Sequence, residues 1–433
     1  MLPVSTEILH SYYKSCGGVV CTDTRNLQPG CMFFCLHGPR FNGNQFAHKA
    51  LELGAAAVVV DDTTLCTDSR IHFVADTLQA LQDLARFHRH ALDTTILAIG
   101  GSNGKTTTKE LCSLVLGTAL KVKATRGNLN NHIGLPLTLL ELTGEEDVAV
   151  VEMGTNHPGE MKVLCDIACA DLGIVTNIGK EHLEGFGDLE AVAKEESELY
   201  LALENYGGEA LVNTDDPWLA NMSKRLHEKR SYGTTGNPDL KGVIRNSMPH
   251  LEFDLYYLEE YIGSYKAQIG GAYNLLNMMA AVSAGMALGL DADPCAKAAC
   301  SYIPGNNRSE WRELNGRSIL LDAYNANPSS MELALREFEK IPGSKAVFLG
   351  DMLEMGDSSA SEHASIFKLC KQLGFDEIYL SGEAFQTAAG NYPLAFANTP
   401  ALLDWLKAHP PKSGTLLIKG SRGMKMESVL EML

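Results

Sequence analysis

One segment constrains the fold of this chain most: a glycine-rich turn between an apolar run and a lysine- and threonine-rich stretch, TILAIGGSNGKTTTKE at residues 95–110. The order predicts a strand, a phosphate-binding loop and a helix. Gly101 and Gly104 would let backbone N–H groups curl around phosphate oxygens. Lys105 adds a positive charge, and the hydroxyl of Thr106 can ligate Mg²⁺.

The spacing GxxGKT is shorter than the common GxxxxGK[ST] pattern, and a chance turn is the alternative interpretation. The flanking strand and helix favour a site for a nucleoside triphosphate, because a phosphate loop needs that context. We expect the triphosphate to contact Gly101, Ser102, Asn103, Gly104, Lys105, Thr106 and Thr107.

Composition limits the possible partners. The chain has 433 residues, which predicts two to four domains at roughly 100–200 residues each. Its net charge of −17 argues against nonspecific binding to nucleic acid or to an anionic membrane, but not against a nucleotide held at a local positive site. The eleven cysteines lack metal-ligand spacing, and those at 31, 35, 165 and 169 are expected to be packed thiols. With apolar runs far too short to span a bilayer, we expect no membrane insertion and a reduced, cytoplasmic protein.

Strand-like runs alternate with helical patterns along the chain, which predicts an α/β fold with a mostly parallel sheet. In the central part these runs are residues 95–99, 148–152, 173–176 and 210–213. Shorter strands are expected around 31–36 and 56–60, and the pattern restarts at 318–321, 345–349, 377–380 and 415–418. We therefore expect three domains, at 1–93, 94–304 and 305–433, the last of them Rossmann-like.

Two strand ends could hold a cation. Glu152 closes the strand in VVEMGTNHPGEM, where a carboxylate is well placed for Mg²⁺, although capping of the next helix is the alternative. Asn177 and His182 follow the next strand, and the histidine is as compatible with a structural role as with ligation. Glu195 and Glu196 are expected to open the following helix, where carboxylates also suit the helix dipole.

Amide clusters suggest recognition of polar groups. Asn130 and Asn131 precede a helix expected to begin near Pro136, and either substrate recognition or a plain loop explains them. Asn274 and Asn277 are three residues apart, hence on one helical face, from which they could reach adenine or ribose.

Three strands of the last domain end in polar side chains, which predicts an open binding edge. These ends carry Asp322 with Asn325, Asp351 with Glu354, and Lys419 with Ser421 and Arg422.

Together these motifs resemble the Mur ligase family, ATP-dependent amide-forming enzymes that build the peptide stem of bacterial peptidoglycan. The resemblance covers essentially the whole chain: GSNGKTT is similar to the family's phosphate loop, and EMG at 152 and NIGKEHLE at 177–184 to its Mg²⁺ segments. YNANPSSM and KGSRGMKM resemble the branch that adds D-Ala-D-Ala to UDP-MurNAc-tripeptide. The segment TDTRNLQPGCMFFCLHGPRF at 22–41 resembles that branch's UDP-binding part.

The resemblance implies that ATP phosphorylates the tripeptide carboxylate and that the amine of D-Ala-D-Ala attacks the acyl phosphate. It implies catalytic roles for Lys105, His182 and Glu196, one Mg²⁺ on Thr106 and Glu152, and a second Mg²⁺ on His182. Further ATP contacts are implied for Asn274, Asn277, Asp322 and Asn325, and substrate contacts for Thr24, Arg25, Asn130, Asn131, Lys419, Ser421 and Arg422. The implied enzyme is a monomer with an N-terminal UDP-binding domain, and nucleic acid is not among its partners.

The chain departs from the family pattern at three places. The family carries a carbamoylated lysine fourteen residues after the metal histidine, where this chain has Glu196. We hypothesise that the glutamate supplies the same negative charge, with Lys194 as the alternative. Tyr273 replaces a histidine, and NGN at 42–44 replaces an acidic residue and a histidine, which leaves the adenine and uridine contacts open.

Three other classes share parts of this pattern. A folylpolyglutamate synthase-like ligase would share the loop and metal segments, but the N-terminal domain and the YNANPSSM and KGSRG segments argue against it. A kinase or motor-type ATPase would turn over ATP without an amide product. A non-enzymatic nucleotide-binding module would bind ATP without any reaction.

Overall fold

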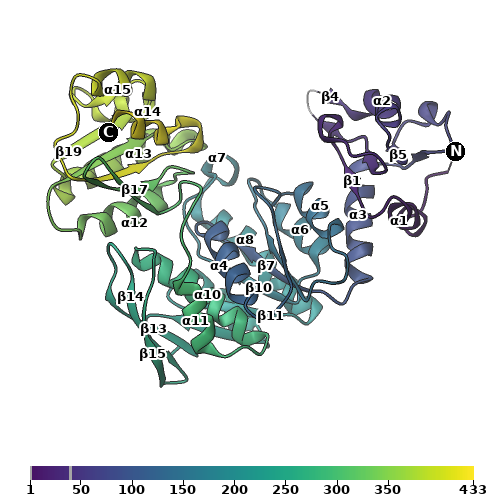
Figure 1. Ribbon diagram of the computed structural model, residues 1–433, viewed down its shortest axis with the longest axis horizontal. Coiled ribbons are helices and arrows are strands. Elements are labelled where there is room, and N and C mark those ends of the chain that lie inside the picture. Colours follow the sequence, from purple (N-terminus) through teal and green to yellow (C-terminus); the bar gives the residue numbers. More distant parts are fainter. Residues whose placement is uncertain (1, 39–40) are drawn as a thin grey trace.

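The computed structural model describes residues 2–38 and 41–433, and it arranges them as three α/β units (Figure 1). Each unit contains one largely parallel sheet with its own helices, which confirms the predicted fold class. The predicted limits of the domains, at 93/94 and 304/305, remain predictions. No helix in the described part of the chain is long and apolar enough to cross a membrane.

The N-terminal unit has a four-stranded parallel sheet in the order β1-β2-β5-β6. Its strands are β1 (Val20–Cys21), β2 (Met32–Phe34), β5 (Ala57–Val60) and β6 (Ile71–Phe73), and a separate small pair joins β3 (His37–Gly38) and β4 (Phe41–Asn42). The helices are α1 (Thr6–Ser15), α2 (Ala47–Glu52) and α3 (Thr77–His90). The strands β2 and β5 coincide with the apolar runs seen in the sequence.

The central unit has a nine-stranded sheet in the order β15-β14-β13-β12-β11-β10-β7-β9-β8. The parallel strands are β7 (Thr95–Gly100), β8 (Val122–Ala124), β9 (Val148–Glu152), β10 (Leu172–Val175), β11 (Glu209–Asn213) and β12 (Lys229–Gly233). Because β7 lies between β9 and β10, the loops at their carboxyl ends converge on one edge. The phosphate loop, Glu152 and the segment after Val175 therefore meet in space.

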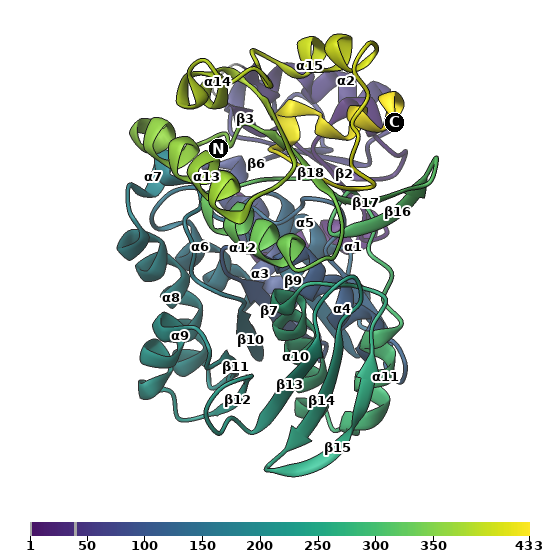
Figure 2. The same ribbon diagram turned by 90° about the vertical axis from the view of Figure 1, so that its left-hand side faces the viewer.

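Two helical layers cover this central sheet, each with its own apolar core (Figure 2). One layer contains α4 (Lys105–Leu116), α10 (Ala272–Ala287) and α11 (Ala292–Cys300). The other contains α5 (Gly134–Leu140), α6 (Glu160–Ala168) and α8 (Leu189–Tyr206), together with α3 of the N-terminal unit. The short helices α7 (Leu183–Phe186) and α9 (Pro217–Met222) lie between strands of the sheet in the chain.

An antiparallel extension of the central sheet was not predicted. It consists of β13 (Leu240–Asn246), which pairs with β12 in parallel, and of β14 (Glu252–Tyr257) and β15 (Glu260–Lys266), which continue the sheet in antiparallel order. The strands β13 and β15 are exposed along much of their length, and charged residues interrupt all three strands, so they lack the continuous apolar runs that mark buried parallel strands.

The C-terminal unit has a six-stranded sheet in the order β16-β17-β21-β18-β19-β20, with only β16 antiparallel. Its strands are β16 (Glu310–Leu314), β17 (Arg317–Asp322), β18 (Lys345–Gly350), β19 (Glu377–Ser381), β20 (Ala395–Phe396) and β21 (Thr415–Lys419). The helices are α12 (Pro328–Glu339), α13 (Ser359–Leu373), α14 (Glu383–Ala389) and α15 (Thr399–Leu406). The ends of β17, β18 and β21 face the central unit.

One helix boundary corrects the sequence analysis. Glu195 and Glu196 do not open a helix, because α8 begins at Leu189 and Asp188 caps it by accepting a hydrogen bond from the backbone N–H of Ala191. Both glutamates therefore lie within the helix and are buried. The start of α8 was not recognised in the run EGFGDLEAV because the short helix α7 ends only two residues before the cap at Asp188.

Candidate active site

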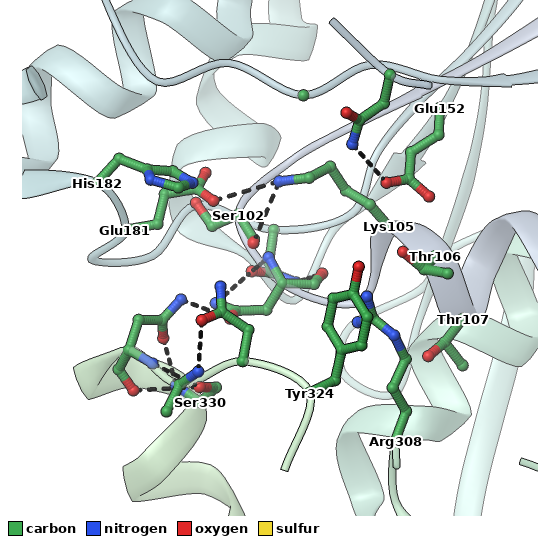
Figure 3. Close-up of a pocket in the computed structure, with 18 of the residues that line it drawn as sticks. Ser102, Lys105, Thr106, Thr107, Glu152, Glu181, His182, Arg308, Tyr324 and Ser330 are labelled. Carbon is green, nitrogen blue, oxygen red and sulfur yellow. Dashed lines mark hydrogen bonds and ion pairs between the residues drawn. The ribbon is translucent and has the colours of Figure 1, made fainter. Parts of the chain in front are cut away.

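A cavity of about 400 Å³ lies where the central and C-terminal units meet (Figure 3). The central unit lines it with the phosphate loop, the segments after β9 and β10, and the start of α10. The C-terminal side contributes residues from 308–309 and 322–333, together with Leu353, Glu354 and Lys419. Two domains thus share one polar cavity.

The phosphate loop has the geometry that its glycines predict. Gly101 and Gly104 have φ values of 107° and 83°, which L side chains rarely adopt, and α4 begins at Lys105. A Cβ atom at Gly101 would collide with Thr176. The backbone N–H of Ser102 donates to the carbonyl of Asn177 over 2.9 Å, so the segment after β10 holds the loop.

Lys105 lies in a buried network of charges. Its Nζ donates to the carbonyls of Gly101 and of Ser102, the latter at 3.3 Å, and pairs with Glu181 Oε2 at 3.2 Å. Burial lowers the pKa of Lys105, but the carboxylates of Glu181, Glu196 and Glu152 outweigh it and raise the pKa overall. The lysine is therefore held as a cation. Glu181 was not among the residues predicted from the sequence, although Glu181 directly precedes the histidine of the NIGKEHLE motif.

Two carboxylate oxygens in the cavity lack partners. Glu152 is 3 % exposed; its Oε1 accepts a hydrogen bond from Asn130 Nδ2 at 2.8 Å, but its Oε2 has no partner among the described residues. The same is true of Glu181 Oε1 within residues 2–38 and 41–433. A buried carboxylate oxygen without a partner is costly, so this arrangement calls for a cation.

These donors fit Mg²⁺. No three His, Cys, Asp or Glu side chains converge as a ready-made metal site in the described part of the chain. Mg²⁺, however, usually binds one or two carboxylates and completes its shell with water and phosphate oxygens. Glu152, Glu181 and the Thr106 hydroxyl line the same cavity and provide hard oxygen ligands of that kind.

His182 lies at the junction of the two units. It lines the cavity, and its Nδ1 contacts Glu354 Oε2 of the C-terminal unit at 2.6 Å. Glu354 thus belongs to the site through a histidine contact that the sequence analysis did not foresee.

Glu196 lies behind the phosphate loop rather than in the cavity. Glu196 is only 1 % exposed, and its Oε2 accepts a hydrogen bond from the backbone N–H of Gly101 at 2.6 Å. Burial raises the pKa of Glu196 to about 8.

The two neighbouring candidates have other positions. Glu195 accepts hydrogen bonds from the N–H groups of Gly159 and Met161 at 2.7 and 2.6 Å, so it caps α6. The exposed Lys194 is not among the cavity-lining residues. The hypothesis that Glu196 replaces a carbamoylated lysine stays a prediction.

The asparagine pair of α10 lines the cavity on one helical face, as its spacing predicts. Asn277 Nδ2 donates to Asn274 Oδ1 at 3.0 Å, and Asn277 Oδ1 accepts from Thr108 Oγ1 at 3.2 Å. Much of the hydrogen-bonding capacity of the pair therefore joins α10 to α4. Tyr273 also lines the cavity, and its hydroxyl lies 3.3 Å from Ser309 Oγ.

The polar strand ends of the C-terminal unit divide into two groups. Asp322, Asn325 and Lys419 line the cavity, and Lys419 Nζ pairs with Asp322 Oδ2 at 2.5 Å. Ser421 and Asp351 lie outside the cavity and have structural roles. The Ser421 hydroxyl accepts a hydrogen bond from the N–H of Leu353, and Asp351 caps α14.

An arginine and a tyrosine missed by the sequence analysis also line the cavity. The guanidinium of Arg308 stacks 3.6 Å from the ring centroid of Tyr324 (Figure 3). Arg422, outside the lining, donates to the Tyr324 hydroxyl at 3.3 Å. Arg308 lies just before β16 in the C-terminal unit and belongs to none of the recognised motifs, so no sequence signal marked it.

The predicted substrate contacts are not all in one place. Asn130 and Asn131 line the cavity, and Asn131 Oδ1 also accepts from the N–H of Gly134 at 2.9 Å at the start of α5. Thr24 and Arg25 lie in the N-terminal unit, outside the cavity, where Arg25 pairs with Asp23 at 2.6 Å. A substrate that reaches both regions must be long.

The fold and this two-domain cavity define a nucleotide-dependent ligase, and comparison with known families agrees. Residues 99–285 match the Mur ligase middle domain, 307–422 the glutamate ligase domain of Mur ligases, and 19–89 the Mur ligase family catalytic domain. The chain belongs to the Mur ligase family.

Similar proteins carry one name. The UDP-N-acetylmuramoyl-tripeptide–D-alanyl-D-alanine ligases of Bacillus subtilis and Escherichia coli are 33 % and 35 % identical, covering 95–96 % of this chain and 92–93 % of their own. MurF of Acinetobacter baumannii superposes with a TM-score of 0.87 at 29 % identity, with 97 % of both chains covered. MurF ligase of Thermotoga maritima, in complex with ADP, gives 0.87 at 27 % identity, with 96 % of both covered.

Proposed function

We propose that this chain is an ATP-dependent ligase that joins D-Ala-D-Ala to UDP-MurNAc-tripeptide in the synthesis of peptidoglycan precursors. The relatives that carry this activity in their names align along nearly their whole length. The observation that carries the proposal is the shared cavity, in which a phosphate loop from one domain faces polar strand ends from another.

In the proposed reaction the tripeptide carboxylate attacks the γ-phosphorus of ATP and releases ADP. The amine of D-Ala-D-Ala then attacks the acyl phosphate, loses a proton and expels phosphate, which leaves the UDP-MurNAc-pentapeptide. The first step brings two anions together, so positive charge and fixed alignment are its main requirements. Lys105 provides such a charge at the base of the loop.

The site residues predicted from the sequence, together with Glu181, take proposed roles on this basis. Gly101 to Thr107 would bind the phosphates; Asn274, Asn277, Asp322 and Asn325 would contact the nucleoside. Thr106, Glu152 and Glu181 would hold Mg²⁺, which supplies charge neutralisation at the phosphates, and His182 would hold a second ion. A monomeric state and a cytoplasmic location belong to the same proposal.

The direct test incubates the full chain with ATP, Mg²⁺, D-Ala-D-Ala and a UDP-tripeptide ending in either meso-diaminopimelate or lysine. Phosphate release and the mass of the UDP-pentapeptide are followed together, and the comparison of the two tripeptides identifies the third residue. Phosphate without pentapeptide would indicate an ATPase or kinase, and ATP binding without either would indicate a binding module. A folate with glutamate serves as the control substrate for the folylpolyglutamate synthase-like alternative.

The role of Glu196 has a separate test. If Glu196 supplies the anion of the missing carbamate, Glu196→Ala should lose most turnover even at saturating Mg²⁺. Near-normal turnover under that condition would exclude the metal role and leave the hydrogen bond to Gly101 as its function.

A further inference from the structure

One side-chain contact joins the candidate metal site to the other domain. His182 follows β10 in the central unit, and Glu354 follows β18 in the C-terminal unit; their Nδ1 and Oε2 atoms are 2.6 Å apart. The backbone N–H of Glu184 donates to the carbonyl of Glu354 at 3.1 Å. Leu183, which lies between His182 and Glu184 in the chain, packs in the apolar cluster of the C-terminal unit. The C-terminal domain therefore holds the histidine segment at three adjacent points.

The backbone on both sides of this pair is unusual. His182 and Glu354 have φ values of 43° and 63°, in the left-handed region that L residues rarely occupy. Such a conformation is strained and persists only where the surrounding contacts impose it. The two side chains are thus brought together by the local folding of two separate loops.

The contact determines which ring nitrogen of His182 is available. An ionised carboxylate only accepts hydrogen bonds, so Nδ1 carries the proton and Nε2 keeps its lone pair. Within residues 2–38 and 41–433 no hydrogen bond or ion pair engages Nε2. Histidines that bind metals commonly donate their other ring N–H to a carboxylate, which orients the ring and makes it a better ligand.

We propose that Glu354 is a positioning residue that orients His182 and fixes its tautomer for a divalent cation. Because Glu354 comes from the C-terminal domain, the cation site is complete only when that domain is docked. The inference rests on the proposed function for one point, the assignment of a cation to His182. Docking of the C-terminal domain would then prepare the metal site as well as bring the substrates together.

A neighbouring ion pair provides a matched control. Lys180 Nζ pairs with Glu362 Oε1 at 2.6 Å, and it joins the same central segment to the C-terminal unit two residues before His182. Glu362→Gln weakens docking at this place without touching the histidine. An effect specific to Glu354 is thereby separated from a general loosening of the domains.

The first experiment measures the histidine tautomer by ¹⁵N NMR of the full chain labelled at histidine. No metal is added, and the pH is about 8, where an ordinary imidazole is neutral. His182→Gln identifies the resonance. We expect the Nδ1–H form in the unsubstituted chain and in Glu362→Gln, and a shift toward the Nε2–H form in Glu354→Ala. An unchanged tautomer in Glu354→Ala, or the same shift in Glu362→Gln, would overturn the proposal.

The second experiment measures Mn²⁺ affinity of the full chain by electron paramagnetic resonance in the presence of ADP. Glu354→Ala should weaken binding at the His182 site by about 10-fold or more, as loss of such partners does elsewhere. Glu354→Gln should fall between, because its amide oxygen can still accept the Nδ1–H bond. Equal affinity in Glu354→Ala and the unsubstituted chain would contradict the inference.

The two proposals fail in different ways. Pentapeptide formation by the unsubstituted chain, with unchanged tautomer and Mn²⁺ affinity in Glu354→Ala, would overturn only the role of Glu354. Absence of pentapeptide would overturn the proposed function, while the tautomer measurement would still report on the contact. More than half of the Glu354 side chain is exposed, so its substitution should not prevent folding.

Discussion

The two walls of the cavity are built differently. On the central wall, the side chains of Lys105 and Glu181 are only 14 % and 5 % exposed, and their partners come from their own domain. On the opposite wall, Lys419 and Asp322 also form a buried pair within one domain, but the Glu354 side chain is 57 % exposed and its hydrogen-bond partner, His182, belongs to the other domain. The wall around the phosphate loop is therefore preformed within one domain, whereas the His182–Glu354 contact depends on docking of the two domains.

The joint between the walls consists largely of single polar contacts. Asn327 Nδ2 donates to Asn103 Oδ1 at 2.9 Å, the N–H of Lys180 donates to Ser329 Oγ at 2.9 Å, and the N–H of Ala272 donates to Glu337 Oε2 at 3.2 Å. Each such bond contributes only about 0.5–1.5 kcal/mol net, because water replaces it when the domains separate. We therefore expect the joint to open and close as substrates and products exchange.

The largest expected effect concerns the preformed wall. Lys105→Ala should reduce kcat by about 10²–10³-fold, because it removes a fixed positive charge where negative charge develops. Pentapeptide formation under saturating ATP measures it. Lys162→Ala, at an exposed i,i+4 pair on α6, is the control and should leave the rate unchanged. If Lys105→Ala reduced kcat by less than about threefold, far below the usual effect of removing such a group, the phosphate wall would not be the more important of the two walls.

A smaller effect is expected from the carboxylate with the unpartnered oxygen. Glu152→Gln should raise the Mg²⁺ concentration for half-maximal activity by about 10-fold or more, since an amide is a weaker ligand than a carboxylate. Titration of the rate with Mg²⁺ measures it, with the exposed Glu190→Gln as control. An unchanged requirement would mean that Glu152 serves only to hold Asn130.

The third effect concerns stability rather than rate. The folded pKa of Glu196, about 8, exceeds its ordinary value of 4.5 because burial penalises the charged form. The folded state therefore binds this proton more tightly, and its contribution to stability is lost as pH rises from about 4.5 through about 8. Glu196→Gln removes that dependence.

Thermal unfolding across this pH range provides the measurement. The variant should gain Tm relative to the unsubstituted chain as the pH rises, with the largest gain above about pH 8. A constant difference in Tm at every pH would show that Glu196 is already ionised in the folded state and that its buried charge is compensated.

The smallest effect is expected at the joint. Glu362→Gln should raise KM for D-Ala-D-Ala less than about fivefold and leave kcat nearly unchanged, because pairs near the surface contribute about 0–1 kcal/mol. Steady-state kinetics at varied D-Ala-D-Ala measures it. A loss in kcat comparable to that of Lys105→Ala would mean that the joint is as rigidly built as the phosphate wall.

Local patterns in the sequence predicted most of the longer parallel strands but missed β1, β6, β8, β12 and β20. The segments that form β7, β9, β18 and β21 are apolar and end in polar residues. This pattern is expected of parallel strands whose two faces are both buried. The strands β13 to β15 were missed because charged residues interrupt their apolar runs, and β13 and β15 are largely exposed. The start of α8 was misplaced because the cap at Asp188 lies only two residues after the end of α7.

The candidate site was predictable where a motif encodes it. Lys105, Glu152 and His182 follow from short segments whose glycines and strand ends imply their geometry, and all three line the cavity. Arg308 and Tyr324 were not predictable, because their contact depends on how the segment before β16 packs against the segment after β17.

The sequence by itself determined the three α/β units, the phosphate loop and the family resemblance, because these depend on local periodicity and on residues close together in the chain. Only the tertiary structure decided which polar groups share the cavity and which serve as caps. It placed Glu196 behind the loop, Glu181 beside Lys105 and Glu354 on His182. Those contacts join residues 76 to 172 positions apart, and their formation depends on the order of strands in the sheets and the docking of domains.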